Sequence, residues 1–440
     1  MFEKLHILRW MAGAFALLLQ WPVAAQTREQ TLHRLNQLLV NTVMDDLFTP
    51  PVACRIYTYP NIAFYECIRN EDPSFLPLSG KLNGLRLPPP EKNTSPDFFI
   101  AACIAFSRTG ESLVGSEYKF KDWREAFLDS LKKITSNGLL ASSIAYGNKI
   151  ADAVIAWHKK DRYGETRGMM RYVTSNKPGK WQPTPIDFAP GLEPHWKFIR
   201  PMTLKNAAQF SPAKKLTYSM SKQSAFYKNL MEVYKTGKQA DSAKKSIAYY
   251  WDDNPNISVE QGHFNYFIHK ISPAGHWIMI TGQVCAEKNI PVLRASQAYV
   301  LSAIAMFDGF ISCWHEKYTT ELIRPVTVIH RYIDEKWEPL IQTPPFPEFT
   351  SGHAVISTAA ATVLTSLFGD YYFFTDNTEA PFGIAPRSFA SFFKASEECA
   401  WSRVYGGIHY PETARISIQQ GGSIGRHVIK TCLPAVVKLK

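Results

Sequence analysis

The sequence predicts an all-α protein made of one or two helical bundles. Several long segments place apolar residues three or four positions apart, which is the spacing of a helix with one buried face. No segment alternates apolar and polar residues regularly enough to indicate a sheet. The chain has 440 residues, and 45% of them are hydrophobic, which is ample material for a large core.

The expected helices, taken in order, cover residues 30–46, 139–160, 213–236, 262–286, 293–317, 352–369, 389–402 and 412–429. Connections rich in proline and glycine separate them, chiefly at residues 87–96, 177–201 and 343–347. The 177–201 connection also holds several aromatic residues, which favours an ordered loop packed over the body; a linker between two parts is the alternative. We therefore expect an N-terminal helical region at residues 26–205 and a C-terminal helical domain at residues 206–440.

Residues 1–25 have the pattern of a secretory signal peptide. Lys4 and Arg9 supply the positive end, an apolar run follows at residues 10–19, and the small residues 23–25 form a cleavage site. An uncleaved anchor is the alternative, but the apolar run is too short to cross a bilayer comfortably. No later segment has spanning length, so we expect an exported soluble protein, periplasmic or secreted.

The seven cysteines are an odd number, and export would permit disulfides between some of them. Cys54 and Cys67 are the first pair to test, although the sequence establishes no pairing. There is no CxxC motif or cluster of cysteine and histidine, so a structural zinc site is not expected.

The formal net charge is +11, and it falls to +10 when the signal peptide is removed. Such a surface favours anionic partners in general, from phosphate to nucleic acid or anionic lipid. The basic residues are scattered in short pairs without an aromatic and basic binding module, so nucleic-acid binding is not favoured. The oligomeric state cannot be inferred.

The most informative stretch is residues 344–353, where a proline-stiffened loop runs into a helix of small residues. Thr350 or Ser351 can cap this helix, and Gly352 allows a ligand to approach the main chain. The free N–H groups of a helix start favour an anion, and His353 adds an ionisable donor. A capped helix with an ordinary histidine is the alternative interpretation.

The flanking residues favour an anion site. Lys317 is followed after six residues by Arg324, and Arg403 is followed after five residues by His409. This order and spacing resembles the three-part signature of the superfamily of vanadium-dependent haloperoxidases and type 2 phosphatidic acid phosphatases. The resemblance covers the C-terminal part of the chain and implies the helical bundles of that superfamily, with the oxyanion site in the C-terminal bundle. Because no spanning helix is expected, the haloperoxidases or the soluble acid phosphatases are favoured over membrane-embedded lipid phosphatases.

The resemblance also implies a role for each residue. Lys317, Arg324 and Arg403 would supply positive charge to the oxyanion, while Ser351 and the Gly352 N–H would complete its hydrogen bonds. His409 would bond the central atom, which is vanadium in a haloperoxidase or phosphorus in a phosphohistidine intermediate. His353 would act as acid and base, deprotonating hydrogen peroxide or protonating a leaving alkoxide.

Two aromatic residues favour the haloperoxidase branch. Trp314 lies three residues before Lys317 and Phe346 lies seven before His353, the positions of a tryptophan and a phenylalanine in the resembled fungal-type chloroperoxidases. Their rings would form a dry wall beside the oxyanion, suited to a halide. Core packing is the alternative.

The sequence departs from the family pattern at two positions. Thr350 replaces a proline, which we expect to be tolerated. Thr413 replaces the usual aspartate four residues after the liganding histidine, which lowers the expected efficiency of catalysis. Asp252 or Asp253 could orient Arg403, but a turn before Pro255 explains them equally well. His263 and His315 are left out of the site.

Three hypotheses follow, in descending order. The first is an exported haloperoxidase-like enzyme that oxidises halide with hydrogen peroxide at a histidine-bound vanadate. The second is a soluble periplasmic acid phosphatase that uses the same residues without vanadate. The third is a non-catalytic oxyanion-binding protein, for which Thr413 is the only indication.

Overall fold

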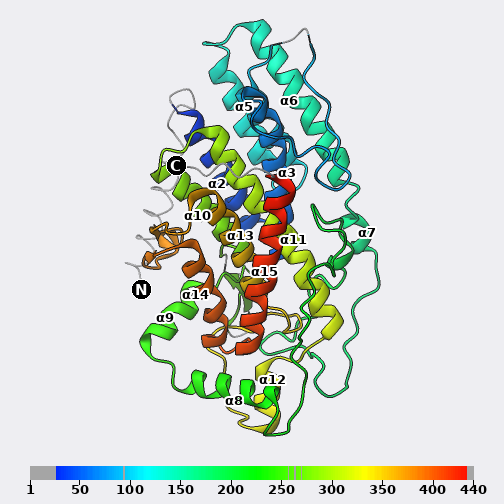
Figure 1. The fold of residues 1–440 in the computed structure, drawn as a ribbon, viewed down its shortest axis with the longest axis vertical. Helices are drawn as coiled ribbons and strands as arrows, with labels where there is room; N and C mark the ends of the chain where they lie inside the picture. Colours follow the sequence, from blue (N-terminus) through cyan, green and yellow to red (C-terminus); the bar gives the residue numbers. More distant parts are fainter. Residues whose placement is uncertain (1–25, 93–94, 256, 262–263, 269, 434–440) are drawn as a thin grey trace.

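The computed structural model describes residues 26–92, 95–255, 257–261, 264–268 and 270–433. The predicted signal peptide lies outside these residues. The molecule is elongated and mainly helical, with α5 and α6 at one end and α8 and α12 at the other (Figure 1). The predicted all-α fold class is confirmed, and within the described part no helix is long and apolar enough to cross a membrane.

The N-terminal half contributes six helices among the described residues. They are α2 (Arg28–Asp45), α3 (Pro50–Ile68), α4 (Phe98–Glu111), α5 (Tyr118–Leu131), α6 (Asn137–His158) and the short α7 (Tyr163–Arg167). Two 3-10 turns, η2 (Arg69–Glu71) and η3 (Trp196–Phe198), also lie in this half. The 177–201 segment is an ordered loop, as expected, because Trp181 and Trp196 are fully buried.

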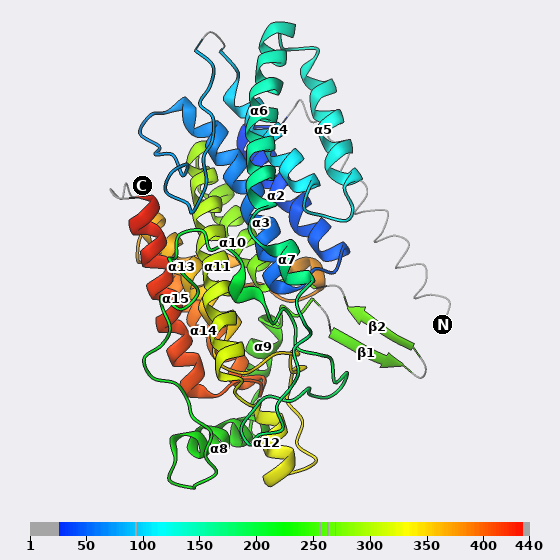
Figure 2. The same cartoon turned by 90° about the vertical axis from the view of Figure 1, so that its right-hand side faces the viewer.

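The C-terminal half contains the remaining elements. Its helices are α8 (Ala225–Lys238), α9 (Ser242–Tyr250), α10 (Pro273–Glu287), α11 (Val292–Thr320), α12 (Pro325–Tyr332), α13 (Gly352–Phe368), α14 (Phe392–Tyr405) and α15 (Pro411–Cys432). A 3-10 turn, η4, spans Ala380–Phe382. Two antiparallel hairpins pair β1 (Ile257–Gln261) with β2 (Phe264–Ile268), and β3 (Phe374–Asp376) with β4 (Arg387–Phe389). The first hairpin projects from the side of the molecule (Figure 2).

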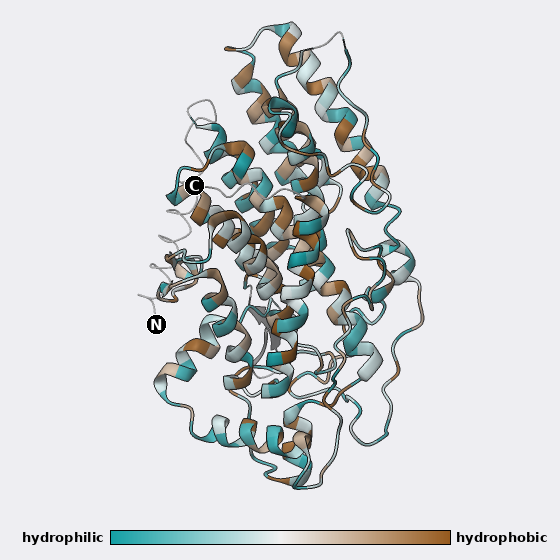
Figure 3. Ribbon diagram, viewed as in Figure 1, coloured by the Kyte–Doolittle hydropathy of each residue, from teal (hydrophilic) through white to brown (hydrophobic). Residues whose placement is uncertain are grey.

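The centre of the molecule is α11, which packs against α3, α10, α13 and α15. Figure 3 shows that the surrounding helices turn apolar residues inward and polar residues outward. The main hydrophobic core runs from Leu32 on α2 to Cys432 on α15, and a smaller second cluster includes Phe226 on α8 and Val328 on α12. The main core contains residues from both sides of residue 205, so the division of the chain there stays a prediction.

Close packing of α13 on α15 fixes the start of α13. A Cβ atom on Gly421 would lie 2.2 Å from the carbonyl oxygen of Val355, and one on Gly425 would lie 2.8 Å from that of Ala359. Two glycines four residues apart on α15 thus allow the two helix backbones to approach each other. This contact holds the first turn of α13, where the predicted oxyanion residues begin.

Several predicted elements were wrong. The helix expected at residues 262–286 begins only at Pro273, because strand β2 occupies residues 264–268. The helix expected from residue 213 begins at Ala225, where Ser224 caps it. The prediction missed α3, α4, α5, α7, α9 and α12, and both hairpins. In α3 almost every residue is buried, so its sequence shows no polar face from which a helical period could be detected.

The candidate disulfide between Cys54 and Cys67 is also wrong. All seven cysteines are buried free thiols. Cys54 and Cys67 lie on the same helix, α3, and a rise of about 1.5 Å per residue separates them by about 20 Å, far beyond bonding distance.

Candidate active site

The predicted site residues come from five segments that meet beside the N-terminus of α13. Lys317 lies in the last turn of α11, and Arg324 directly precedes α12. Ser351 is the N-cap of α13, and Arg403 lies in the last turn of α14. His409 lies in the loop just before α15. The fold thus brings together residues that are up to 92 positions apart in the sequence, since Lys317 and His409 both face this region.

Lys317 is fully buried and held by main-chain carbonyls of the proline-rich loop. Its Nζ donates to the carbonyl oxygens of Pro347 at 3.0 Å and Glu348 at 3.2 Å, and also to that of Thr350. Burial lowers the pKa of Lys317 to about 7, and Arg324 acts in the same direction. A bound anion would favour the charged ammonium again.

Both arginines are buried and only partly hydrogen-bonded. Arg324 donates through Nε to the carbonyl of Phe346 at 2.9 Å and through Nη1 to that of Ile408 at 2.8 Å. Arg403 donates through Nη1 to the carbonyl of Trp251 at 2.7 Å. The Nη2 atom of Arg324 and the Nε and Nη2 atoms of Arg403 have no hydrogen-bond partner within the described chain. Buried donors of this kind need an acceptor, because leaving them unpaired is costly.

His409 is oriented by a carboxylate that the sequence analysis missed. Its Nδ1 lies 2.8 Å from Oε1 of Glu348, and the backbone N–H of Tyr410 donates to the same oxygen at 3.0 Å. The hydroxyl of Thr413 donates to the other oxygen, Oε2, at 3.0 Å. Because Nδ1–H faces Glu348, the lone pair of Nε2 is free to face the site, where Nη1 of Arg324 lies 3.3 Å away.

Glu348 therefore stands in for the aspartate that Thr413 replaces. Burial raises the pKa of Glu348 to about 7, while Arg324 and the Tyr410 N–H act against this rise. The sequence signal for it was an acidic residue inside the proline-rich loop, five positions before His353. The carboxylate that is missing at position 413 is thus supplied by Glu348 from the proline-rich loop.

The start of α13 has the expected cap. The Ser351 hydroxyl accepts from the N–H of Ala354, and the Ser351 N–H donates to the hydroxyl of Ser417 at 2.9 Å. His353 follows in the first turn, and its Nε2 is buried without a hydrogen-bond partner among the described residues. Burial lowers the pKa of His353 well below its usual value, and Arg403 and other nearby cations lower it further.

Trp314 and Phe346 form an aromatic wall at this site. Their rings lie 5.1 Å apart, and Trp314 would be 3.5 Å from a Cβ atom on Gly352. Phe346 also faces the cations, with Nζ of Lys317 4.8 Å and Cζ of Arg324 5.1 Å from its ring centre. The two rings are therefore beside the predicted site as well as in contact with each other.

The structure separates the roles of the two neighbouring aspartates. Asp252 is the one near Arg403, with Oδ1 at 3.9 Å from Nη2, and its other oxygen pairs with Lys270 at 3.1 Å. Asp253 instead faces His276. Of the two histidines left out of the site, His263 lies outside the described residues, and His315 is only partly exposed, with a pKa lowered by burial.

These residues fit a tetrahedral oxyanion. Three buried basic side chains and two histidines influence one another electrostatically, and the cations lower the pKa of His409 in addition to burial. The unpaired N–H donors on both arginines need an acceptor from outside the described chain, and the N-terminus of α13 favours an anion beside them.

Comparison with known proteins agrees with this geometry. A family model described as the VCPO second helical-bundle domain matches residues 297–436. Among curated proteins, no sequence matches the chain. A solved structure of a bacterial vanadium-dependent iodoperoxidase is 39% identical, with a TM-score of 0.87, covering 94% of this chain and 98% of that chain.

Two further structures share the fold at low identity. A holo-type bacterial vanadium-dependent chloroperoxidase is 16% identical, with a TM-score of 0.68, covering 88% of this chain and 92% of that chain. Its apo-type counterpart is 15% identical, with a TM-score of 0.66, covering 88% and 95%. The extent and identity of the iodoperoxidase match go beyond a shared fold. The chain belongs to the vanadium-dependent haloperoxidases and has a function of the haloperoxidase kind.

Proposed function

We propose that this protein binds vanadate at the site described above and oxidises iodide with hydrogen peroxide. The single observation that carries the proposal is the set of unpaired buried N–H donors on Arg324 and Arg403, which call for an oxyanion. Iodide is proposed because the relative that is 39% identical over nearly the whole chain is an iodoperoxidase. Iodide is also the halide that is easiest to oxidise among the common ones.

Each residue has a proposed task in holding the cofactor. His409 would bond vanadium through Nε2, in the tautomer that Glu348 fixes. Lys317, Arg324 and Arg403 would hold the oxygens by charge-assisted hydrogen bonds, each worth about 1.5–3 kcal/mol. Ser351 and the Gly352 N–H would complete the set. When bound, vanadate would supply the Lewis-acidic centre at which hydrogen peroxide is activated for two-electron oxidation of the halide.

His353 is the proposed acid and base of the reaction. Its Nε2 has no partner among the described residues, and its lowered pKa keeps it neutral and able to accept a proton from hydrogen peroxide. The overall reaction consumes one proton, one halide and one peroxide and gives hypohalous acid and water. Trp314 and Phe346 would exclude water from the halide's approach.

Export is part of the proposal and is supported by the signal-peptide pattern of residues 1–25. The seven buried thiols would be shielded from oxidants in an oxidising compartment. Expression in a bacterial host followed by N-terminal sequencing of the mature chain tests this point. A mature chain that begins at Gln26 supports export, and a chain that keeps residues 1–25 contradicts it.

The function is tested by titrating vanadate into the purified protein while following three reactions on the same samples: iodide oxidation, bromide oxidation and phosphate-ester hydrolysis. We expect peroxide-dependent oxidation to rise with vanadate, and iodide to be turned over with higher kcat/KM than bromide. If vanadate only inhibits hydrolysis and no oxidation appears, the site is that of a phosphatase. If the kcat/KM for bromide equals or exceeds that for iodide, the proposed halide is wrong.

A further inference from the structure

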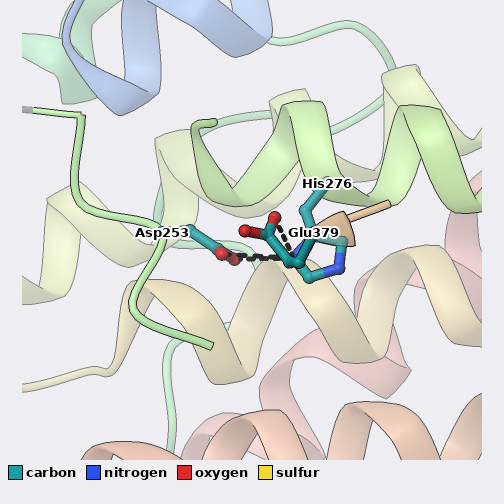
Figure 4. A group of neighbouring side chains, drawn as sticks. All are labelled: Asp253, His276 and Glu379. Carbon is teal, nitrogen blue, oxygen red and sulfur yellow. Dashed lines mark hydrogen bonds and ion pairs between the residues drawn. The ribbon is translucent and has the colours of Figure 1, made fainter. Parts of the chain in front are cut away.

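A second cluster of ionisable side chains lies behind the oxyanion site and has no part in the proposed reaction. His276 on α10 is fully buried, and Asp253, which follows α9, and Glu379, which precedes η4, are 2% and 4% exposed. Figure 4 shows both carboxylates turned toward the ring of His276. One atom from each residue lies within 4.8 Å of the other two.

The ring of His276 is held from its far side by a third carboxylate. Its Nε2 lies 2.8 Å from Oδ2 of Asp376. The other oxygen of Asp376 accepts from the N–H of Thr378 at 3.0 Å and from the Thr378 hydroxyl at 2.7 Å, which fixes this carboxylate in place. A carboxylate that accepts from one ring nitrogen of a histidine orients the other nitrogen, as it does in many metal centres.

The remaining nitrogen, Nδ1, faces only electron-rich atoms. Both oxygens of Asp253 lie 3.1 Å from it, and Oε1 of Glu379 lies 3.7 Å from it. A proton on Nδ1 would hydrogen-bond Asp253, but it would reach Glu379 only as an ion pair at 3.7 Å. Oε1 of Glu379 would stay buried without a hydrogen-bond partner among the described residues. A cation placed between the three groups would satisfy all of them.

We propose that Asp253, His276 and Glu379 bind a divalent transition-metal ion of the Zn²⁺ or Mn²⁺ class. Ligand atoms about 2.0–2.1 Å from a tetrahedral Zn²⁺ lie about 3.3 Å from one another. The distances from Nδ1 of His276 to the oxygens of Asp253 and Glu379, 3.1 and 3.7 Å, bracket this value. The imidazole nitrogen favours these ions over Ca²⁺ and Mg²⁺, which prefer oxygen ligands. The ligands come from three separate segments, so they form no spacing motif that the sequence could show.

The metal would stabilise the segment that holds Arg403. The indole of Trp251 stacks on His276 at 4.7 Å, and the Trp251 carbonyl accepts from Arg403 at 2.7 Å. Asp252, between Trp251 and the proposed ligand Asp253, faces Arg403. Because Trp251, Asp252 and Asp253 are consecutive, a metal that holds Asp253 in place would also hold Trp251 and Asp252. These two residues are the neighbours of Arg403 at the oxyanion site. The proposal itself concerns metal binding and holds whichever halide the enzyme uses.

The test begins with the tag-free full-length protein, dialysed and analysed for metals by mass spectrometry. We expect about one Zn²⁺ or Mn²⁺ per chain. After chelation, adding Zn²⁺ or Mn²⁺ to the vanadate-free protein should raise Tm by at least about 2 °C, while Mg²⁺ and Ca²⁺ should not. Glu379→Gln preserves the side-chain volume and should abolish both the retained metal and the shift in Tm.

Glu397→Gln is the matched control, because Glu397 lies on the exposed face of α14 and pairs only with Lys394 in the described structure. It should keep the metal and the shift in Tm. The proposal is overturned if the unmodified protein neither retains nor responds to Zn²⁺ or Mn²⁺, which would leave a proton as the cation of the cluster. Equal responses of the Glu379→Gln and Glu397→Gln variants would also overturn it, since binding would then lie elsewhere.

Discussion

Oε1 of Glu348 lies 2.8 Å from Nδ1 of His409, and the two residues are fully or almost fully buried together. The hydroxyl of Thr413, which occupies the position of the family's usual aspartate, donates to the other oxygen of the same carboxylate. The carboxylate beside His409, the proposed vanadium ligand, therefore comes from the proline-rich loop and not from α15. The histidine keeps the same tautomer, with Nε2 facing the site.

Glu348→Gln is expected to weaken vanadate binding about 10- to 100-fold. The amide keeps the shape of the side chain but loses its charge, and an NH₂ group would face either His409 Nδ1–H or the Thr413 hydroxyl. Vanadate affinity measured by titration against peroxidase activity checks the prediction. An unchanged affinity would show that Glu348 does not tune His409.

Moving the carboxylate from position 348 to position 413 tests whether Glu348 takes the place of the family's usual aspartate. Thr413→Asp alone would bury a second carboxylate beside Glu348, so we expect a lower Tm and no gain in activity. Glu348→Gln combined with Thr413→Asp should recover part of the affinity lost in Glu348→Gln. A double variant no better than the single one contradicts the idea that Glu348 replaces the aspartate.

His353→Ala should lower kcat for halide oxidation by about 10²- to 10⁴-fold, because the acid and base is removed. Vanadate should still bind, since Lys317, Arg324, Arg403 and His409 are intact. Steady-state kinetics at saturating vanadate separates these two effects. His195→Ala is the control, because His195 lies on the η3 loop and bonds the carbonyl of Met170; its kcat should stay as it is in the unmodified protein.

Phe346→Leu keeps the apolar surface of the site but removes the ring that faces Lys317 and Arg324. Loss of two cation–π contacts, each about 0.5–2 kcal/mol, should weaken vanadate binding several-fold or more. Trp401→Leu removes the exposed contact with Arg415, whose Cζ lies 5.3 Å from that ring, and should leave the affinity unchanged. Equal vanadate affinities of the two variants would show that Phe346 contributes only to packing.

Gly421→Ala should destabilise the protein by about 1–3 kcal/mol, because the new methyl group would meet the carbonyl oxygen of Val355 at 2.2 Å. In Gly422→Ala, on the same helix, the new methyl group would lie 3.2 Å from the flexible end of Arg426 and in ordinary contact with Thr358 at 3.8 Å, so this variant should be stabilised by up to about 1 kcal/mol. Urea unfolding of both variants checks the prediction. Equal stabilities of the two variants would show that α13 and α15 can move apart to accommodate a methyl group at position 421.

Stability should fall with decreasing pH because of His158. Burial and the charge of Arg55 lower the pKa of His158 from 6.5 to about 3, and Nη2 of Arg55 donates to its Nδ1 at 3.2 Å. Between these two pKa values the unfolded chain binds a proton that the folded chain does not. The free energy of unfolding therefore decreases as pH falls through this window, by up to about 1.4 kcal/mol per unit.

His158→Gln removes the titrating group while keeping an acceptor for Arg55. Urea midpoints at several pH values should show a shallower decline for this variant than for the unmodified protein. Parallel declines would assign the acid sensitivity to other groups.

The sequence by itself determined the all-helical class and the spacing of the oxyanion residues. Both are local: Ser351 caps the helix it precedes, and the signature residues were recognised in short segments. It could not reveal α3, whose faces are all buried and therefore show no period. Only the tertiary structure brought Glu348 to His409, chose Asp252 over Asp253 as the neighbour of Arg403, and grouped Asp253 with His276 and Glu379. Such pairings join residues 23 to 151 positions apart, and side-chain contacts at that separation depend on how helices pack, which no local pattern encodes.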